Sequence, residues 1–265
     1  MGVFRFKKFN VVNERSAMKV NTDGVLLGAA MTLAPSDCRL LDIGTGTGTI
    51  ALMAAQRLAD LRRISPIHID AIDIDEPSAS EAAANFRQSP WADVLQAHNL
   101  SLDQFESTLE VVASATPPTS SLTTPLEGQQ SECKYDLIFS NPPYFEDSLT
   151  APDERKSTAR HTSDGLSYRD IFDFAKNRLS ADGRVSLVLP ADQETAICRY
   201  ARMSGMHLFR VLRIRTVPRK APSRVVIEFS RQRPEEVDDT ILTIQNEGQY
   251  TDEYLSLTKD FYLFA

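Results

Sequence analysis

Cysteine is scarce in this chain of 265 residues, and the few that occur exclude two kinds of protein. Cys38, Cys133 and Cys198 lie far apart in the sequence and form no C-x-x-C pair. A domain held together by disulfides, or by a structural zinc ion, needs closely spaced ligands. We therefore expect a protein of the reducing cytoplasm that contains neither disulfides nor a metal ion.

Long apolar runs are also missing. No segment approaches the roughly 20 consecutive apolar residues that a membrane-spanning helix needs. The N-terminal MGVFRFKKFNVV has neither the apolar core nor the cleavage site of a signal peptide. With 42% hydrophobic and 25% charged residues, the composition is that of an ordinary globular protein, and we expect no membrane partner.

Basic residues are outnumbered, and the net charge is −7 at pH 7, which argues against a nucleic-acid ligand. Their distribution argues the other way. Between Arg199 and Arg224 there are eight Lys or Arg residues and no Asp or Glu, and the first 20 residues hold five basic residues against Glu14. A local basic patch can bind phosphate despite a negative total. A solvated surface without a ligand is the alternative.

Short apolar segments alternate with segments of helical periodicity along most of the chain. This alternation predicts an α/β fold, with a seven-stranded, mostly parallel sheet, helices on both faces and an antiparallel closing strand. We expect strands at residues 39–43, 67–75, 92–97, 135–140, 183–190, 207–217 and 223–230, and helices at 49–61, 77–89, 167–179 and 191–204. Residues 111–134, rich in Ser, Thr and Pro, are typical of a flexible insertion.

The segment LDIGTGTG places Gly44, Gly46 and Gly48 between a strand and a helix, where glycine lets the backbone approach a ligand. The spacing does not match the G-x-G-x-x-G fingerprint of dinucleotide-binding folds. Asp42, just before the turn, would repel a pyrophosphate but attract an ammonium group. A ligand with an amino-acid tail and an adenosine fits better, and S-adenosylmethionine is such a ligand.

Polar side chains also end the next two strands. Asp73 comes 29 residues after Gly44 and can accept hydrogen bonds from both ribose hydroxyls, whereas Asp75 lies further out. Asn99, after the third strand, can bond to an adenine edge. Solvent-exposed carboxylates and an ordinary loop asparagine are the alternatives.

The fourth strand ends in FSNPPYF, and two prolines suffice to stop it. The flanking residues suggest more than a stop. Asn141 offers a donor and an acceptor to an amide-like edge, and Pro142 fixes the backbone so that its carbonyl and that of Asn141 can accept from an amine. Tyr144 offers an aromatic face on which a flipped base can stack. The amine can attack first and lose its proton afterwards, so catalysis would be mostly positioning.

These motifs together resemble class I S-adenosylmethionine-dependent methyltransferases that modify exocyclic or amide nitrogens, which have a Rossmann-like fold. The segments FRFKKFNVV, RSAMKVNTDGVLLGA, ALMAAQR, QSPWA, FSNPPYF and FYLF are similar to the bacterial tRNA1(Val) adenine N6-methyltransferases, which methylate the adenine beside the anticodon. The resemblance covers nearly the whole chain except residues 111–134. It implies one methyltransferase domain over residues 1–265, S-adenosylmethionine as cofactor and tRNA as substrate.

The resemblance also implies roles for individual residues, and it places residues 1–34 over the cofactor pocket. The implied cofactor-binding residues are Lys19, Thr22, Asp23, Asp42, Gly44, Gly46, Asp73, Asn99 and Asn141, with Gly24 in the same N-terminal segment. The implied catalytic residues are Asn141, Pro142, Pro143 and Tyr144. Asn99 departs from the family, which typically has an acidic residue there, although an amide can still accept from the adenine amine.

An RNA substrate would supply phosphates for the basic residues to bind, because Arg and Lys make most phosphate contacts. Such contacts carry little sequence information. The residues expected to contact RNA are Arg155, Lys156, Arg160, Arg213, Arg215, Arg219, Lys220 and Arg224. His161, in the same stretch, is interpreted as an ordinary loop residue. We expect a monomer.

Two alternatives stay open at this point. The tetrapeptide also suits a protein glutamine side chain or a DNA adenine, because an amide and an aminopurine present similar hydrogen-bonding edges. The second alternative is a nicotinamide oxidoreductase or a non-catalytic nucleotide-binding module. The mismatch to the G-x-G-x-x-G fingerprint disfavours it.

Overall fold

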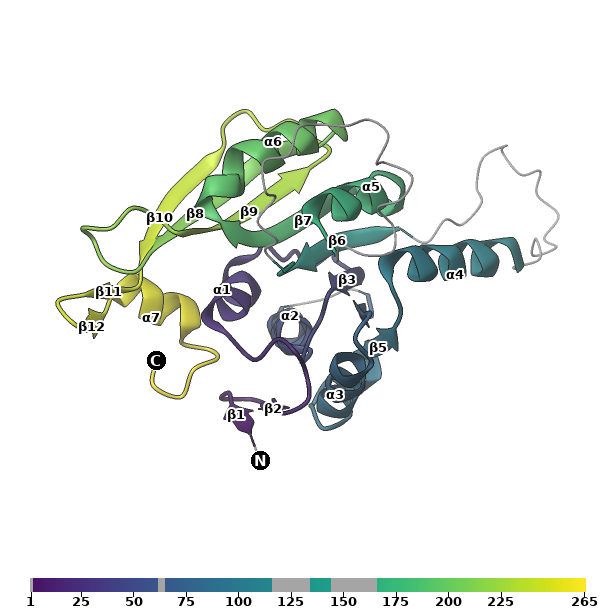
Figure 1. The fold of residues 1–265 in the computed structure, drawn as a ribbon, viewed down its shortest axis with the longest axis horizontal. Helices are drawn as coiled ribbons and strands as arrows, with labels where there is room; N and C mark the ends of the chain where they lie inside the picture. The colour runs from purple at the N-terminus through teal and green to yellow at the C-terminus, as the bar shows by residue number, and fades with distance from the viewer. Residues whose placement is uncertain (1, 62–64, 116–133, 144–165) are drawn as a thin grey trace.

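The structure is a computed structural model, and an eight-stranded sheet forms its centre (Figure 1). Residues 2–61, 65–115, 134–143 and 166–265 are described. In spatial order the strands are β10 (Asp238–Thr243), β8 (His207–Arg215), β9 (Arg224–Ser230), β7 (Leu179–Pro190), β6 (Tyr135–Ser140), β3 (Arg39–Ile43), β4 (His68–Asp73) and β5 (Leu95–Asn99). Only β9 within this sheet runs against its neighbours, β7 and β8. The predicted α/β fold, with parallel strands and an antiparallel closing pair, is confirmed.

Helices cover both faces of the sheet (Figure 1). One face carries α1 (Thr22–Ala30), α2 (Thr49–Asp60), α3 (Glu76–Arg87) and α7 (Asp252–Thr258), and the other carries α4 (Leu102–Ala115), α5 (Tyr168–Arg178) and α6 (Glu194–Met203). Alternation along the strands supplies both cores, since Leu40 packs in the first and Leu41 in the second. None of the helices in the described part of the chain is long and apolar enough to cross a membrane.

Three differences from the sequence-based expectation have physical causes. The predicted count of seven strands is one short, because β10 is a largely exposed edge strand that lacks an apolar alternation. Residues 111–115, expected in a flexible insertion over 111–134, belong to α4, which continues to Ala115; residues 116–133 lie outside the described part. The third strand begins at Leu95 instead of Ala92, because Ala92–Val94 forms a 3-10 turn.

Two small antiparallel pairs flank the sheet. The pair β1 (Val3–Arg5) and β2 (Asn10–Val12) packs beside α3. The pair β11 (Gln245–Asn246) and β12 (Gln249–Tyr250) lies between β10 and α7. Glu247 and Gly248 both have positive φ, 50° and 81°, which suits the tight two-residue connection of a hairpin.

Candidate active site

The glycine turn after β3 lies at the carboxyl edge of the sheet, and its backbone conformation requires glycine. Gly44, Gly46 and Gly48 have φ of 72°, 56° and 79°, in the left-handed region that favours glycine. Gly48 is also confined, because a Cβ there would lie 2.5 Å from Cε1 of Phe86. The backbone nitrogens of Gly44 and Thr45 donate to the carbonyl of Ile72, which ties the turn to β4. The turn is therefore a fixed backbone cradle.

Asp42 is buried directly behind this turn. Its Oδ2 accepts a hydrogen bond from Oγ1 of Thr45 at 2.7 Å. Its Oδ1 is buried and makes no hydrogen bond of normal geometry in the part of the chain that the structure describes, although the backbone N–H of Ala51 is close enough to lower the pKa of this carboxylate. Burial raises the pKa of Asp42 to about 7. A buried acceptor of this kind fits the ammonium group of an S-adenosylmethionine tail, which would satisfy it and favour its ionised form.

Asp73, the residue expected at the ribose, and Asp75, expected further out, have different contacts. Asp73 accepts from the backbone nitrogen of Gly46 at 2.8 Å through Oδ2 and from that of Asp75 at 2.9 Å through Oδ1. Burial is the main cause of its raised pKa. Asp75 caps α3 by accepting from the backbone nitrogen of Ser78. Only Asp73 therefore borders the glycine turn, and each of its oxygens keeps a lone pair for a hydroxyl.

Asn99 and Ile74 form the next part of this edge. Nδ2 of Asn99 donates to the carbonyls of Asp73 and Ile74, at 3.0 Å each, so its side-chain oxygen is the atom left for a ligand. Ile74 is 76% exposed, and sequence reasoning missed it. The available signal was its position between two acids at a strand end. His98 turns away from this edge, because its Nε2 bonds to Asp70 at 2.9 Å.

The Asn-Pro-Pro segment emerges beside the turn because β6 neighbours β3. Oγ of Ser140 donates to the carbonyl of Ile43 at 2.6 Å, which joins the two strand ends. Asn141 is 5% exposed, Pro142 is buried and Pro143 is exposed. Tyr144, like Arg155, Lys156, Arg160 and His161, lies outside the described residues.

The N-terminal segment runs past both features. Oε1 and Oε2 of Glu81 accept from the backbone nitrogens of residues 14, 15 and 16 at 2.8, 2.9 and 3.0 Å. A Cβ on Gly46 would lie 3.5 Å from the carbonyl oxygen of Met18. The Sδ of Met18 lies 3.6 Å from Nδ2 of Asn141. Residues 14–18 are thus held by α3 and placed against the turn and the Asn-Pro-Pro segment.

The other predicted N-terminal residues have contacts of their own within the fold. Nζ of Lys19 donates to the carbonyl of Glu14 at 2.6 Å. Thr22 and Asp23 line a cavity, where Oδ2 of Asp23 accepts from Nε of Arg224 at 2.8 Å. Whether they also contact a cofactor stays a prediction.

The basic segment is free of acids in the sequence but not in space. Arg213 is paired with Glu194 and Asp239, which raise its pKa. Arg215 donates to Oγ1 of Thr243 and to the carbonyl of Pro218. These arginines therefore hold the fold together, while Arg219 and Lys220 are exposed in the loop between β8 and β9.

The described residues contain no group of three or more His, Cys, Asp or Glu side chains arranged to hold a metal ion.

Solved structures resemble the fold. A predicted O-methyltransferase from Agrobacterium tumefaciens has a TM-score of 0.59 at 16% identity and covers 90% of this chain and 96% of its own. A putative class I S-adenosylmethionine-dependent methyltransferase from Listeria monocytogenes has a TM-score of 0.52 at 14% identity, with 89% and 65% covered. The fold is therefore that of class I methyltransferases.

Relatives match nearly the whole chain, although no family model matches it. A tRNA1(Val) (adenine(37)-N6)-methyltransferase of Bacteroides fragilis is 39% identical over 260 residues, which are 98% of this chain and 97% of the relative. Proteins of the same name from Parabacteroides distasonis and Flavobacterium psychrophilum are 38% and 33% identical, again over 98% of this chain. With its glycine turn and Asn-Pro-Pro segment at one sheet edge, this chain belongs to the tRNA1(Val) (adenine(37)-N6)-methyltransferase family.

Proposed function

We propose that this chain methylates N6 of adenine 37 in tRNA1(Val), the reaction for which its relatives are named. The observation that carries the proposal is the buried Oδ1 of Asp42, which makes no hydrogen bond of normal geometry within the described residues, beneath a turn that borders Asn141. One edge of the sheet thereby offers an acceptor for an ammonium group next to a polar clamp for an amine.

The residues around the turn suit S-adenosylmethionine, which supplies an electrophilic methyl group. Asp42 would bind its ammonium group, and Gly44 and Gly46 would let the backbone approach its tail. Asp73 would accept from the ribose hydroxyls. The side-chain oxygen of Asn99 would accept from the adenine amine, and the exposed Ile74 would cover the ring.

The Asn-Pro-Pro-Tyr segment would hold the target adenine. The side chain of Asn141 can accept from N6–H, and the backbone carbonyls of Asn141 and Pro142 can direct the nitrogen lone pair out of the ring plane. Pro143 stiffens the turn, and Tyr144 is the predicted stacking face. N6 would take the methyl group as the bond from that carbon to sulfur breaks, and N6 would release a proton to solvent. No side chain has to act as a general base, so positioning supplies most of the acceleration.

The remaining predictions complete this function. Residues 1–265 form one methyltransferase domain, residues 1–34 cover the cofactor, and the protein acts as a cytoplasmic monomer. The RNA phosphates contact Arg155, Lys156, Arg160, Arg215, Arg219 and Lys220. Support for the N-terminal cover comes from the contacts of Met18 with the turn and with Asn141.

Methyl transfer from radiolabelled S-adenosylmethionine to an unmodified tRNA1(Val) transcript tests the proposal, with nucleoside mass spectrometry to identify N6-methyladenosine. Asn141→Ala should abolish transfer. Asn177→Ala is the matched control, because Asn177 is exposed at the end of α5 and should leave the rate unchanged. Labelling of protein or DNA, with none of tRNA, would overturn the substrate assignment.

A further inference from the structure

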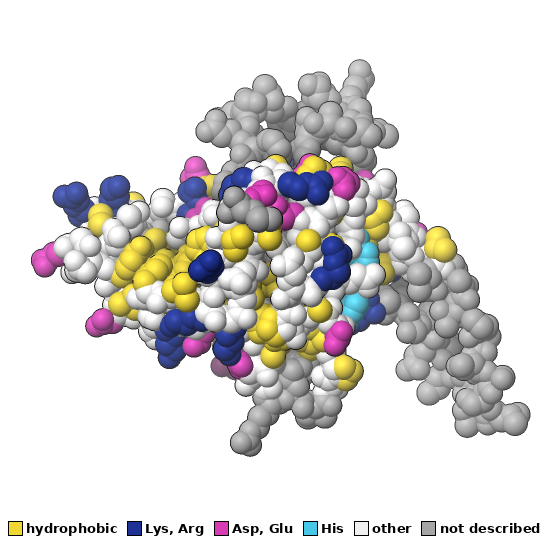
Figure 2. All heavy atoms as spheres, turned by 90° about the horizontal axis from the view of Figure 1, so that it is seen from below, with side chains coloured by type: hydrophobic (Ala, Val, Ile, Leu, Met, Phe, Trp, Pro, Cys, Tyr) yellow, Lys and Arg dark blue, Asp and Glu magenta, His cyan; other side chains and the backbone are white. Residues whose placement is uncertain are grey.

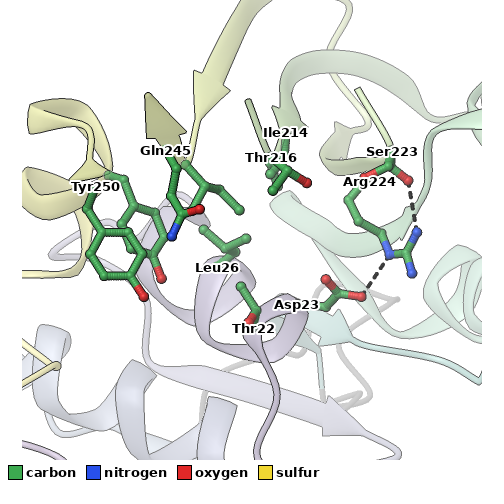
Figure 3. A pocket seen from close by; sticks show the side chains of 11 residues that line it. Thr22, Asp23, Leu26, Ile214, Thr216, Ser223, Arg224, Gln245 and Tyr250 are labelled. Atoms are coloured by element: carbon green, nitrogen blue, oxygen red, sulfur yellow. Dashed lines mark hydrogen bonds and ion pairs between the residues drawn. The ribbon is translucent and has the colours of Figure 1, made fainter. Parts of the chain in front are cut away.

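A cavity of about 390 Å³ opens at the same carboxyl edge of the sheet, where the antiparallel strands β8 and β9 contribute to its lining (Figure 3). It lies where β8 and β10 end, between the start of α1 and the β11–β12 hairpin with α7. From β6, which ends at Ser140 just before Asn141, the path to β8 crosses β7 and β9. Three strand spacings amount to roughly 15 Å. The volume falls within the range of small-molecule sites.

One wall of the cavity is aromatic. Tyr250 is 41% exposed, and its ring centroid lies 5.0 Å from that of Tyr254 and 5.1 Å from that of Phe264. Phe264 is itself 56% exposed. Figure 2 shows hydrophobic side chains gathered on the side where Figure 1 places the β11–β12 hairpin and α7. Exposed aromatic rings that neighbouring rings hold in place suit a flat ligand.

The rest of the lining combines the apolar Leu26, Ile214 and Ile244 with polar side chains. Gln245 lies beside Tyr250 (Figure 3) and offers both a donor and an acceptor, as the edge of a base requires. Its backbone nitrogen donates to the carbonyl of Thr216 at 2.9 Å. On the opposite side the Arg224–Asp23 ion pair closes the wall (Figure 3). Hydroxyls of Thr22 and Thr216 are placed for sugar oxygens.

Positive charge stands next to the cavity. Thr216 and Ser223, both in the lining, begin and end the stretch that carries the exposed Arg219 and Lys220. A turn with a hydrogen bond from the nitrogen of Lys220 to the carbonyl of Val217 shapes this loop. An aromatic wall, an amide, hydroxyls and adjacent cations together match a base, a sugar and a phosphate.

One segment connects this cavity with the candidate active site. Met18 lies against Asn141, and four residues later Thr22 lines the cavity. We propose that the cavity binds a second unpaired nucleotide of the same RNA, a few positions from the target adenine, and so holds the loop open while the target occupies the Asn-Pro-Pro segment. This inference rests on the proposed function for its RNA substrate.

Binding is measured directly by fluorescence anisotropy with a labelled anticodon stem-loop of tRNA1(Val). Tyr250→Ala should weaken binding by roughly 10-fold or more, as for the loss of a stacked base. Tyr250→Phe should bind nearly as the unchanged protein does. Thr216→Trp, at an exposed position of the lining, should block the cavity without removing any native contact of Tyr250. Ile241→Ala, exposed on β10 outside the lining, is the matched control.

An abasic substitution at each unpaired loop position other than the target separates stacking from a structural role. At one loop position, the loss of the base should lower the RNA affinity of the unchanged protein but should hardly change that of the Tyr250→Ala variant. S-adenosylmethionine affinity should be the same in all variants.

Unchanged RNA affinity in both Tyr250→Ala and Thr216→Trp would overturn the proposal, as would additive losses at every abasic position. A parallel loss of S-adenosylmethionine affinity would assign the cavity to the cofactor instead. If the cavity variants lose RNA affinity but the unchanged protein transfers no methyl group, the proposed reaction fails and the nucleotide site stands.

Discussion

The carboxylate of Asp73 bonds to the backbone nitrogen of Gly46 at 2.8 Å, so the end of β4 directly holds the turn that follows β3. Asp73, the predicted acceptor for the ribose hydroxyls, therefore also maintains the shape of the glycine turn. The side chain of the neighbouring Asp75 caps α3 instead, and its backbone nitrogen donates to Oδ1 of Asp73. A substitution of Asp73 should therefore lower cofactor affinity, whereas a substitution of Asp75 should lower the stability of the fold.

Asp73→Asn should weaken S-adenosylmethionine binding by roughly 10- to 100-fold, since hydrogen bonds to a charged acceptor contribute about 1.5–3 kcal/mol. Isothermal titration calorimetry measures this loss. Asp75→Ala is the comparison: loss of an N-cap should lower the free energy of unfolding by about 1 kcal/mol with little effect on affinity. Equal losses of affinity in the two variants would contradict the division of roles.

Asp42→Asn should stabilise the cofactor-free protein increasingly as the pH rises. Burial raises the pKa of Asp42 to about 7, well above its unfolded value near 4. The stability linked to its proton is therefore fully present below about pH 4 and is lost as the pH rises through about 7. The neutral amide avoids that loss. At pH 9 the free energy of unfolding of the variant should therefore exceed that of the unchanged protein by on the order of 1–4 kcal/mol.

Thermal melts of both cofactor-free proteins between pH 5 and pH 9 measure this effect. The two curves should diverge with pH, while the variant should bind S-adenosylmethionine poorly because it lacks the charge. Parallel curves would mean that Asp42 is already ionised without a ligand.

The sequence predicted the elements on which this site depends, because their signals are local. The strands at 39–43 and 135–140 are confirmed to the residue, since each is a buried apolar run ended by glycine or proline. Tertiary contacts decided the rest. Arg213 meets Glu194 and Asp239 only through strand pairing and helix packing, and His98 bonds to Asp70 across neighbouring strands. No local pattern shows such partners.

Gly48→Ala should destabilise the protein more than Gly205→Ala. Both glycines are in the left-handed region, with φ of 79° and 76°, so both substitutions carry the backbone strain of about 1 kcal/mol. Only at Gly48 would the new methyl group meet a neighbour, the ring of Phe86, whereas at Gly205 nothing lies within 4 Å. Urea denaturation should show an extra loss of roughly 1–3 kcal/mol at Gly48 from overpacking. Equal losses would mean that the ring moves aside freely.

Glu81→Ala should release the N-terminal segment and, with it, part of the cofactor affinity. Glu81 is 3% exposed, and its carboxylate accepts from three successive backbone nitrogens of residues 14–16, contacts that lower its pKa. Because its pKa is lowered in the fold, the stability it contributes is present above its unfolded pKa and is lost as the pH falls through the folded one. The substitution should lower the free energy of unfolding at pH 7 by on the order of 2 kcal/mol, because it leaves backbone donors without a partner.

Hydrogen exchange at residues 14–18 reports the release directly, and titration with S-adenosylmethionine reports its consequence. If residues 1–34 cover the cofactor, exchange should accelerate and affinity should fall together. Arg87→Ala serves as the control, since Arg87 is exposed in the last turn of the same helix, at the opposite end from Glu76. Faster exchange with unchanged affinity would show that the segment packs on α3 without contributing to the cofactor site, and residues 1–34 would then lose their proposed role.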